Sequence, residues 1–237
     1  VTMCYASGHY NQTGSTNTAI GTESMRGVSG NSHSNNTAVG YQSLYSVTTG
    51  SNNVAIGKQA GYSSDSNGSN VFIGWNAGYE ADSDNISAIN NVYIGQAAGR
   101  FLDDGQNNVA IGYDAMASNS DGAGNVVNAC IAIGRNAMAT SQTNEGTIVI
   151  GHYAGDADID IDSAVIIGRE AGRGVLTSGA DGTVAVGYKA LTSLTSGGNN
   201  IAVGYQAGKS QTTASNCTWI GINAGQEHIT GDSNTAI

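Results

Sequence analysis

Apolar residues recur along this chain in short runs, and each run is followed by a longer polar segment. A typical run is three residues long, ends on Ile or Val and stands directly before a glycine, as in NNVAIG and NNVYIG. Such a run is too short for a helix, and a short apolar run bounded by turn residues is typical of a strand. The glycines of the motif are Gly21, Gly40, Gly57, Gly74, Gly95, Gly112, Gly134, Gly151, Gly168, Gly187, Gly204 and Gly221.

The intervals between these glycines show a repeat with a base period of 17 residues. Successive intervals are 19, 17, 17, 21, 17, 22, 17, 17, 19, 17 and 17 residues, so four repeats carry insertions of two, four, five and two residues. Cys4 precedes Gly21 by 17 residues and marks one further copy. A fixed period is typical of a solenoid, in which each repeat is one structural unit that stacks on its neighbours.

Counting each repeat from its glycine, as position 0, shows which positions are constrained. Positions −3 and −1 are β-branched in all twelve copies, position −4 is Asn in seven, and position +3 is Ala or Ser. Residues −3 and −1 share one face of a strand, where β-branched side chains are favoured. The glycine indicates a corner that needs positive φ or leaves no room for a Cβ, and the small residue at +3 indicates a second tight corner.

The four insertions all fall in the polar stretch between +5 and −4, for example in Tyr79–Asn91 and Ala117–Cys130. Insertions are tolerated where a chain turns through solvent, so this stretch is predicted to be the loop face of the coil. The sequence therefore predicts an all-β fold, a parallel β-solenoid (β-roll) of about 13 coils. Residues 1–237 are expected to form a single repeat domain, which is a segment of a longer fibre.

Position −2 lies on the opposite face of the strand from positions −3 and −1. It is Ala in seven copies, and in the other five it is Phe72, Tyr93, Val149, Ile166 and Trp219. A strand that is apolar on both faces is typical of burial on both sides. One face can fill the coil, and we expect the −2 face to meet identical partner chains, with a homotrimer as the predicted closure. The alternative is a monomer whose Ala-rich face is simply flat.

Charge and cysteine content narrow the choice of partners. The net charge is −10, with 8 Lys and Arg in 237 residues and no cationic run, so no nucleic acid is expected as a ligand. No segment approaches the ~20 apolar residues of a membrane span, so no membrane insertion is expected. The 3 cysteines do not suggest a disulfide framework. Cys130 and Cys217 share position −4 but lie five coils apart, about 24 Å at the spacing of stacked strands.

In the twelve glycine copies, positions +1 and +5 together hold seven of the eight cationic residues and eight aromatic ones. In consecutive coils, position +5 reads Arg26, Tyr45, Tyr62, Tyr79 and Arg100, which predicts an aromatic ladder with a cation at each end. The favoured interpretation is that these side chains join coil to coil or chain to chain through stacking and cation–π contacts. The alternative is a glycan-binding strip, because sugar rings stack on exposed aromatic side chains. The aromatic candidates are Tyr41, Trp75, Tyr113, Tyr188, Tyr205, Tyr45, Tyr62 and Tyr79.

The segment from Asp156 to Asp162 alternates Asp with apolar residues and places all its carboxylates on one face. Carboxylates suit Ca²⁺, but a single row at ~6.6 Å intervals is too widely spaced for one chain to encircle an ion. A solvated acidic face that discourages edge pairing is therefore predicted, and no cofactor is expected. The alternative is a calcium site formed by Asp156, Asp158, Asp160 and Asp162.

Catalytic patterns are not apparent in the sequence. The histidines His9, His33, His152 and His228 show no metal-ligand spacing. Neither a nucleophile elbow, a phosphate loop, a CxxC pair nor a pair of catalytic carboxylates occurs. Because the coils are all alike, they offer no specialised cleft, and we expect that the protein is not an enzyme.

The repeat resembles a known class of fibre proteins. The segment NTAVGYQSLYSVTTGSNNVAIGKQAG is similar to the repeats of bacteriophage tail-fibre shafts and bacterial surface fibre proteins, and more loosely to the head repeats of trimeric autotransporter adhesins. The resemblance covers the chain from Thr18 to Ile237. It implies a trimeric β-roll used for attachment. The 17-residue period is longer than the adhesin head repeat, which favours the tail-fibre class.

These observations favour a non-enzymatic structural and attachment segment of an extracellular fibre, on a virion or on a microbial cell surface, with a cell-surface glycan as a further partner. The alternative is a subunit of a self-assembling extracellular filament, glycosylated at sequons such as Asn11, Asn35, Asn67, Asn85 and Asn216. An ice-binding solenoid would need a regular surface array of Thr, which does not persist through the coils. A tailspike-like lyase would need a groove with acids and ranks last.

Overall fold

The computed structural model is an all-β parallel β-solenoid of about 13 turns, as the 17-residue period predicts. It describes residues 1–80, 88–102, 105–118, 126–140, 143–157 and 159–237. The chain divides into two compact units, unit 1 (residues 1–127) and unit 2 (residues 128–237), and both repeat the same coil. Parts of the two long insertions predicted as loops, 81–87 and 119–125, lie outside the described residues.

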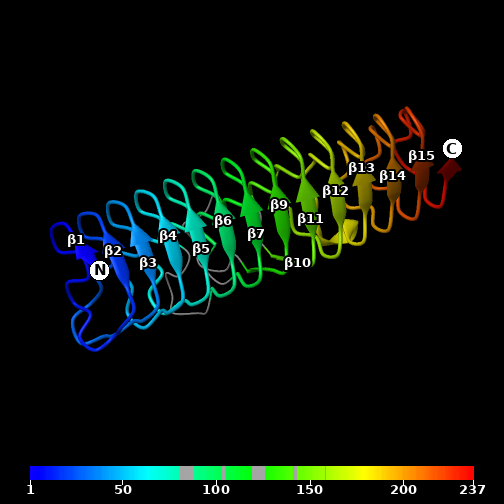
Figure 1. Ribbon diagram of the computed structural model, residues 1–237. Coiled ribbons are helices and arrows are strands. Elements are labelled where there is room, and N and C mark those ends of the chain that lie inside the picture. The colour runs from blue at the N-terminus through cyan, green and yellow to red at the C-terminus, as the bar shows by residue number, and fades with distance from the viewer. Residues whose placement is uncertain (81–87, 103–104, 119–125, 141–142, 158) are drawn as a thin grey trace. The chain divides into compact units, whose positions relative to one another are not determined.

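Unit 1 contributes one short strand from each coil, and the strands lie side by side in chain order (Figure 1). They pair parallel and in register, so that Val54 lies beside Val71 and Ala55 beside Phe72. Register of this kind stacks every repeat position on its counterpart in the next coil. The strands are β1 (Thr2–Met3), β2 (Thr18–Ile20), β3 (Thr37–Val39), β4 (Val54–Ile56), β5 (Val71–Ile73), β6 (Val92–Ile94) and β7 (Val109–Ile111).

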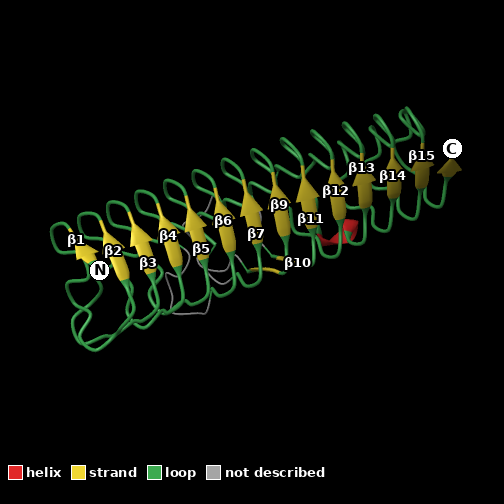
Figure 2. Cartoon of the chain, viewed as in Figure 1, coloured by secondary structure: helices red, strands yellow, loops and turns green. Residues whose placement is uncertain are grey.

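Unit 2 continues the same pattern of three-residue strands joined by long loops (Figure 2). Its strands are β9 (Ile131–Ile133), β11 (Ile148–Ile150), β12 (Val165–Ile167), β13 (Val184–Val186), β14 (Ile201–Val203), β15 (Thr218–Ile220) and β16 (Thr235–Ala236). Two further strands, β8 (Val127–Asn128) and β10 (Asn144–Glu145), pair with each other. The described residues include a single helix, the 3-10 turn η1 (Ser178–Ala180).

The glycine at position 0 is required for two reasons that act together. Gly57 has a φ of +133°, a conformation that residues with a Cβ rarely adopt. A Cβ added to Gly57 would also lie 2.5 Å from the carbonyl oxygen of Gly74 in the next coil. The position-0 glycines therefore stack backbone against backbone at the first corner of each coil.

The second corner is a tight turn from position 0 to position +3. In one coil the amide of Ala60 donates to the carbonyl of Gly57 at 3.4 Å, and Gln59 at +2 has a φ of +57°. Positive φ at the third residue is typical of a type II turn. Ala60 is fully buried, which explains why position +3 is restricted to Ala and Ser.

The two strand faces are the reverse of the sequence-based prediction. Every −2 side chain from Ala19 to Trp219 is buried, with an exposed fraction of 3% or less. The β-branched side chains at −3 and −1 are partly exposed instead, and Ile56 and Ile220 each reach 40%. The prediction that the −2 face meets partner chains is therefore wrong, because this face fills the coil. The face left for a partner is the β-branched one.

Positions −2 and +4 share the interior of the coil and compensate for each other in size. Ala110 at −2 is matched by Met116 at +4, and both are fully buried. Tyr93 at −2 is matched by Gly99, where a Cβ would lie only 2.3 Å from the tyrosine ring. The interior therefore takes one large side chain from either position, since packing to native density leaves no room for two.

Candidate functional site

The outward side chains at −3 and −1 form an apolar strip in each unit, here called the outward strip. Because the strands pair in register, these side chains stack in two straight columns. At ~4.8 Å per strand, the strip of unit 1 is about 30 Å long. All its residues are uncharged. Among the strands that precede a glycine corner, the most exposed members of the two strips are Ile56 (40%), Ile111 (36%), Ile201 (41%), Val203 (37%) and Ile220 (40%).

The tyrosines at +5 in unit 1 (Tyr45, Tyr62 and Tyr79, here the tyrosine ladder) stack ring on ring. The ring centroids of Tyr45 and Tyr62 are 4.9 Å apart with an interplanar angle of 1°, and those of Tyr62 and Tyr79 are 5.0 Å apart at 18°. Arg26 lies over the Tyr45 ring at 5.3 Å and donates a hydrogen bond to the Tyr45 hydroxyl. Arg100 packs over Phe101 at 4.6 Å. The tyrosine ladder thus joins coil to coil, and its ring faces lie against one another.

Partial burial of the tyrosine ladder also affects its chemistry. Burial raises the pKa of the central phenol, Tyr62, and the neighbouring phenols Tyr45 and Tyr79 add to the shift. The Tyr62 phenol is therefore neutral around pH 7, and it stacks on its two neighbours as an uncharged ring.

The +1 position of unit 1 presents aromatic side chains to solvent. Tyr41 is 46% exposed, Trp75 is 49% exposed and Tyr113 is 44% exposed. Lys58, which lies between Tyr41 and Trp75 in the coil order, places its Nζ 5.5 Å from the centroid of the Trp75 ring. Exposed rings of this kind can stack on a ligand, which the rings of the tyrosine ladder cannot do.

The +1 position of unit 2 carries a different set of side chains. Tyr188 and Tyr205 stack with centroids 5.3 Å apart, and the cations of Arg169 and Lys189 lie 5.8 Å and 5.3 Å from the Tyr188 ring. Glu170 pairs with both cations, at 3.1 Å from Arg169 and 3.3 Å from Lys189. The predicted aromatic residues are therefore held in a network of charges in unit 2.

The acidic segment alternates as predicted, with Ile159 and Ile161 buried in the coil. Asp156 pairs with Arg173 at 3.0 Å, and the Asp162 carboxylate accepts the amide of Glu145 at 2.7 Å. Asp158 lies outside the described residues. Within the described part of the chain, His, Cys, Asp and Glu form no group of three or more that could hold a metal ion.

Asparagines at −4, buried from Asn36 onward, form an asparagine ladder through unit 1 that the sequence analysis missed. Asn53 donates through Nδ2 to the carbonyl of Asn67 across its own coil at 2.8 Å. Its Oδ1 accepts the amide of Asn70 in the next coil at 2.9 Å. The recurrence of Asn at −4 was the visible signal, since buried backbone groups at a corner need partners. The asparagine ladder comprises Asn17, Asn36, Asn53, Asn70, Asn91 and Asn108.

The cysteines and sequons differ in exposure. Cys4 is exposed, whereas Cys130 and Cys217 are buried thiols outside any disulfide of the described residues, and burial raises the pKa of Cys130 to about 11. Among the sequons, Asn35 and Asn216 are exposed, but Asn67 is fully buried and its side chain accepts the amide of Ala88. The sequon at Asn67 is therefore not accessible in this fold. Asn85 lies outside the described residues.

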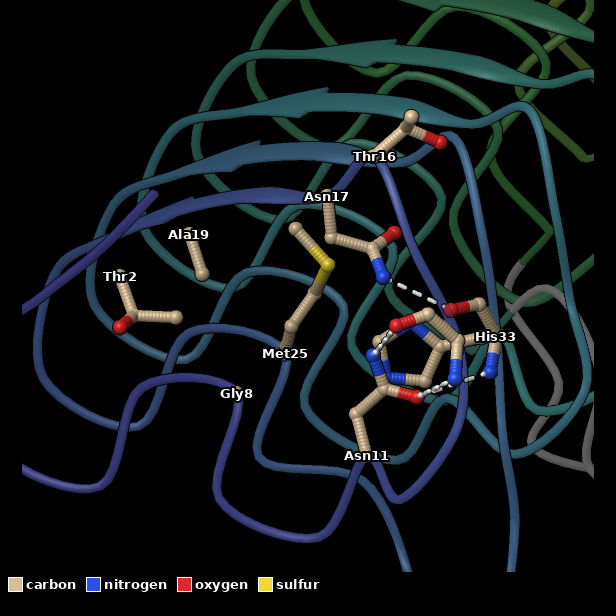
Figure 3. A pocket seen from close by; sticks show the side chains of 9 residues that line it. Thr2, Gly8, Asn11, Thr16, Asn17, Ala19, Met25 and His33 are labelled. Atoms are coloured by element: carbon tan, nitrogen blue, oxygen red, sulfur yellow. Dashed lines mark hydrogen bonds between the residues drawn. The ribbon is translucent and has the colours of Figure 1, made fainter.

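A cavity of about 270 Å³ lies in the first coil of unit 1 (Figure 3). It arises because Thr2 at −2 and Gly8 at +4 are both small, so no large side chain fills this coil. In the other such pair of unit 1, Ala55 and Gly61, the ring of Phe72 fills the space, since a Cβ on Gly61 would meet it at 2.6 Å. The cavity is lined by Thr2, Gly8, Asn11, Gly14, Thr16, Asn17, Ala19, Met25 and His33.

His33 is the one ionisable side chain in the lining of this cavity. It is 2% exposed, and burial lowers the pKa of its imidazole, so the ring is neutral at pH 7. Its Nε2 has no hydrogen-bond partner within the described residues. Asn11 and Asn17 bind the backbone of His33 at 3.2 Å and 2.7 Å, as Figure 3 shows. A lone neutral imidazole can exchange hydrogen bonds but offers neither a nucleophile nor a second acid or base.

Comparison of the chain with models of known protein families, with characterised proteins and with solved structures finds no match in any of the three. The described residues contain no helix of the length and apolarity that a membrane span requires. The coil, the outward strip and the exposed aromatic residues are therefore the features from which a function is inferred.

Proposed function

We propose that this chain is a non-enzymatic shaft and attachment segment of an extracellular fibre, carried by a virion or a microbial cell surface, in which identical chains associate as a homotrimer. The observation that carries the proposal is the outward strip. An apolar strip of this length on a repeating scaffold is typical of a surface that another molecule covers.

A second copy of the chain is the partner that fits the outward strip best. It presents the same two columns of Val, Ile and Thr with the same spacing of ~4.8 Å along the solenoid, so side chains of one copy fit between those of another. The strip is free of charge, which lets it approach its counterpart although each chain carries a net charge of −10. Three strips around one axis close the assembly and leave the polar loops outside.

The test is the mass of the assembly in solution, measured by light scattering coupled to size-exclusion chromatography. We expect a trimer for the native chain and dissociation for Ile56→Lys, which places a charge in the outward strip. Val28→Lys is the matched control, because Val28 is an equally exposed aliphatic residue in a loop of the same unit, at 47%. Circular dichroism checks that both variants keep the solenoid.

Two outcomes would contradict this proposal. A native chain that stays monomeric at micromolar concentration shows that the outward strip needs no copy of itself. An open-ended polymer favours the filament alternative over the closed trimer, because only a heterologous contact continues without closing.

A further inference from the structure

We infer that the +1 residues of unit 1 form a binding row for an extended, uncharged β-1,4-linked polysaccharide, with one aromatic ring for each disaccharide. This inference rests on the attachment role proposed above and names its ligand class. The row, here called the aromatic row, comprises Tyr5, Tyr41, Trp75 and Tyr113, with Thr22, Lys58 and Gln96 between them.

The aromatic row alternates strictly from coil to coil. An aromatic residue occupies +1 in the first, third, fifth and seventh coils, and a polar residue occupies it in the coils between. All four rings are open to solvent, with exposed fractions of 77% for Tyr5, 46% for Tyr41, 49% for Trp75 and 44% for Tyr113. The intervening Thr22, Lys58 and Gln96 are exposed as well. The rings therefore lie on every second step of the solenoid.

Backbone hydrogen bonds fix the spacing of the aromatic row. The carbonyl of each +1 residue accepts the amide of the +2 residue in the next coil, for example Lys58 from Asn76 at 3.0 Å and Trp75 from Ala97 at 2.8 Å. The same bond recurs at every step from Tyr5 to Gln96. Adjacent coils are thus held at ~4.8 Å, and consecutive rings of the row lie ~9.6 Å apart.

The spacing distinguishes the aromatic row from the tyrosine ladder. Rings in successive coils cover each other, as Tyr45 and Tyr62 do at 4.9 Å, and leave no face for a sugar. Rings in alternate coils are too far apart to stack on one another. Ring-on-ring stacking within the aromatic row is therefore excluded, and the exposed part of each ring is accessible to a ligand. At Trp75 this part adjoins the Lys58 side chain, whose Nζ lies 5.5 Å from the ring centroid.

The class of ligand follows from this interval and from charge. In an extended β-1,4-linked glycan, successive pyranose rings are turned over, so the same sugar face recurs once per disaccharide, at about the interval of the aromatic row. The sugars between can hydrogen-bond to Lys58 and Gln96. An α-1,4-linked glycan curves away from a straight row. A polyanionic glycan is disfavoured by the net charge of −10.

The test is isothermal titration calorimetry of the full chain with cellohexaose and with chitohexaose, and maltohexaose serves as the curved control. We expect binding of one or both β-1,4-linked hexaoses and none of maltohexaose. The two positive arms distinguish a plain glucan from an N-acetylated one. Trp75→Ala should weaken binding about tenfold, the loss of one ring-stacking contact. Tyr205→Ala is the matched control, because Tyr205 is a 48% exposed ring at +1 of unit 2, where the alternation is absent.

A composition-neutral variant tests the spacing itself. The double substitution Trp75→Gln with Gln96→Trp moves one ring by one coil, and we expect it to weaken binding as much as Trp75→Ala does. The inference is overturned if neither β-1,4-linked hexaose binds or if maltohexaose binds equally well. It is also overturned if the moved-ring variant keeps the affinity of the native chain, or if Tyr205→Ala weakens binding as much as Trp75→Ala does. Light scattering on the same samples keeps this outcome separate from the trimer, since loss of binding in an intact trimer contradicts only the aromatic row.

Discussion

Units 1 and 2 repeat one coil but satisfy its buried polar groups differently. In unit 1, the asparagine ladder runs without interruption through position −4, with hydrogen bonds of 2.8–2.9 Å between Asn53 and its two partners. In unit 2, Thr147 donates its amide to the Cys130 sulfur at 3.4 Å, and Ala164 donates to the Thr147 hydroxyl, also at 3.4 Å. The residues at −4 of unit 2 are Cys130, Thr147, Ala164, Thr183, Asn200, Cys217 and, before the last strand, Asn234.

The difference shows which part of the coil is essential. The strands and corners are the same in both units, although Ala164 offers no side-chain acceptor and the buried Thr183 hydroxyl has no partner within the described residues. Unit 2 packs aliphatic side chains into its interior instead, among them Ile159, Ile161 and Leu176. The glycine corner is therefore the part of the coil that both units require. The interior of the coil can be stabilised either by the asparagine ladder, as in unit 1, or by aliphatic packing, as in unit 2.

The largest loss of stability is expected when the glycine at position +4, inside the coil, is enlarged. Gly99→Ala in unit 1 places a methyl group 2.3 Å from the Tyr93 ring, whereas Gly155→Ala in unit 2 places it 3.5 Å from Val149 and Ile159. Both residues have positive φ, which costs about 1–2 kcal/mol for an L-residue, and overpacking adds about 1–3 kcal/mol at Gly99 only. Urea unfolding followed by circular dichroism, at fixed chain concentration, measures both. Equal losses would show that backbone conformation alone decides the effect.

The second largest loss of stability is expected when the asparagine ladder is broken. Asn53→Ala removes the side-chain amide that donates to the Asn67 carbonyl and accepts the Asn70 amide, and we expect a loss of about 2–4 kcal/mol in the free energy of unfolding. Thr183→Val in unit 2 removes a buried hydroxyl that has no hydrogen-bond partner among the residues that the structure describes, so it should be neutral or stabilising. Hydrogen exchange reports on each unit separately. A large loss for Thr183→Val would mean that the second unit depends on polar contacts too.

A smaller change in stability is expected when an asparagine of the unit 1 type is introduced at position −4 of unit 2. In Ala164→Asn, the new amide can donate across the coil to Ala180 and accept the amide of Thr183, as Asn53 does in its own coil. We expect a gain of about 1 kcal/mol, the net value of a buried hydrogen bond. Thermal unfolding monitored by circular dichroism measures it. A loss instead would show that aliphatic packing has taken the space that the amide needs.

The smallest effect is a pH dependence confined to unit 2. Burial raises the pKa of Cys130 to about 11 from an ordinary value of 9.0, so the folded chain holds this proton more tightly than the unfolded chain. The resulting stability is complete below about pH 9 and is lost as the pH rises toward 11, by about 0.5–1 kcal/mol at pH 9.5. Hydrogen exchange at pH 8 and pH 9.5, corrected for intrinsic rates, should show the loss in unit 2. In Cys130→Ser the change should disappear, and its persistence would assign it to another group.

Most of the coil could be predicted from the sequence, because its backbone conformation permits only certain residue types at the corners. Gly57 marks a corner that tolerates no Cβ, Ala60 marks the tight turn, and the three residues before each glycine are the strand. The direction of the two strand faces was wrong, since three residues of alternation do not say which side is interior. The pairing of Tyr93 with Gly99 and of Ala110 with Met116 contained that information.

The candidate site was less predictable, for a geometric reason. Sequence counting placed Tyr45 and Tyr62 in the same column, and the structure stacks them. Sequence counting did not distinguish the stacked rings of Tyr45 and Tyr62 from the exposed rings of Tyr41 and Trp75. The exposure of a ring depends on whether the next coil carries an aromatic residue at the same position. The cavity beside His33 depends on the absence of a large neighbour at two positions, Thr2 and Gly8. Fibre, trimer and glycan remain predictions that the experiments above test.

The stacked position-0 glycines also make each unit a molecular ruler. Backbone meets backbone at this corner, so the rise per coil is set by atoms that cannot be compressed or exchanged. Insertions of two, four or five residues enlarge a loop sideways without lengthening the stack. Length can change only by whole coils, in steps of ~4.8 Å. The loop surface of the solenoid could therefore diversify in evolution one residue at a time. The length of the solenoid would change only by duplication or deletion of complete repeats.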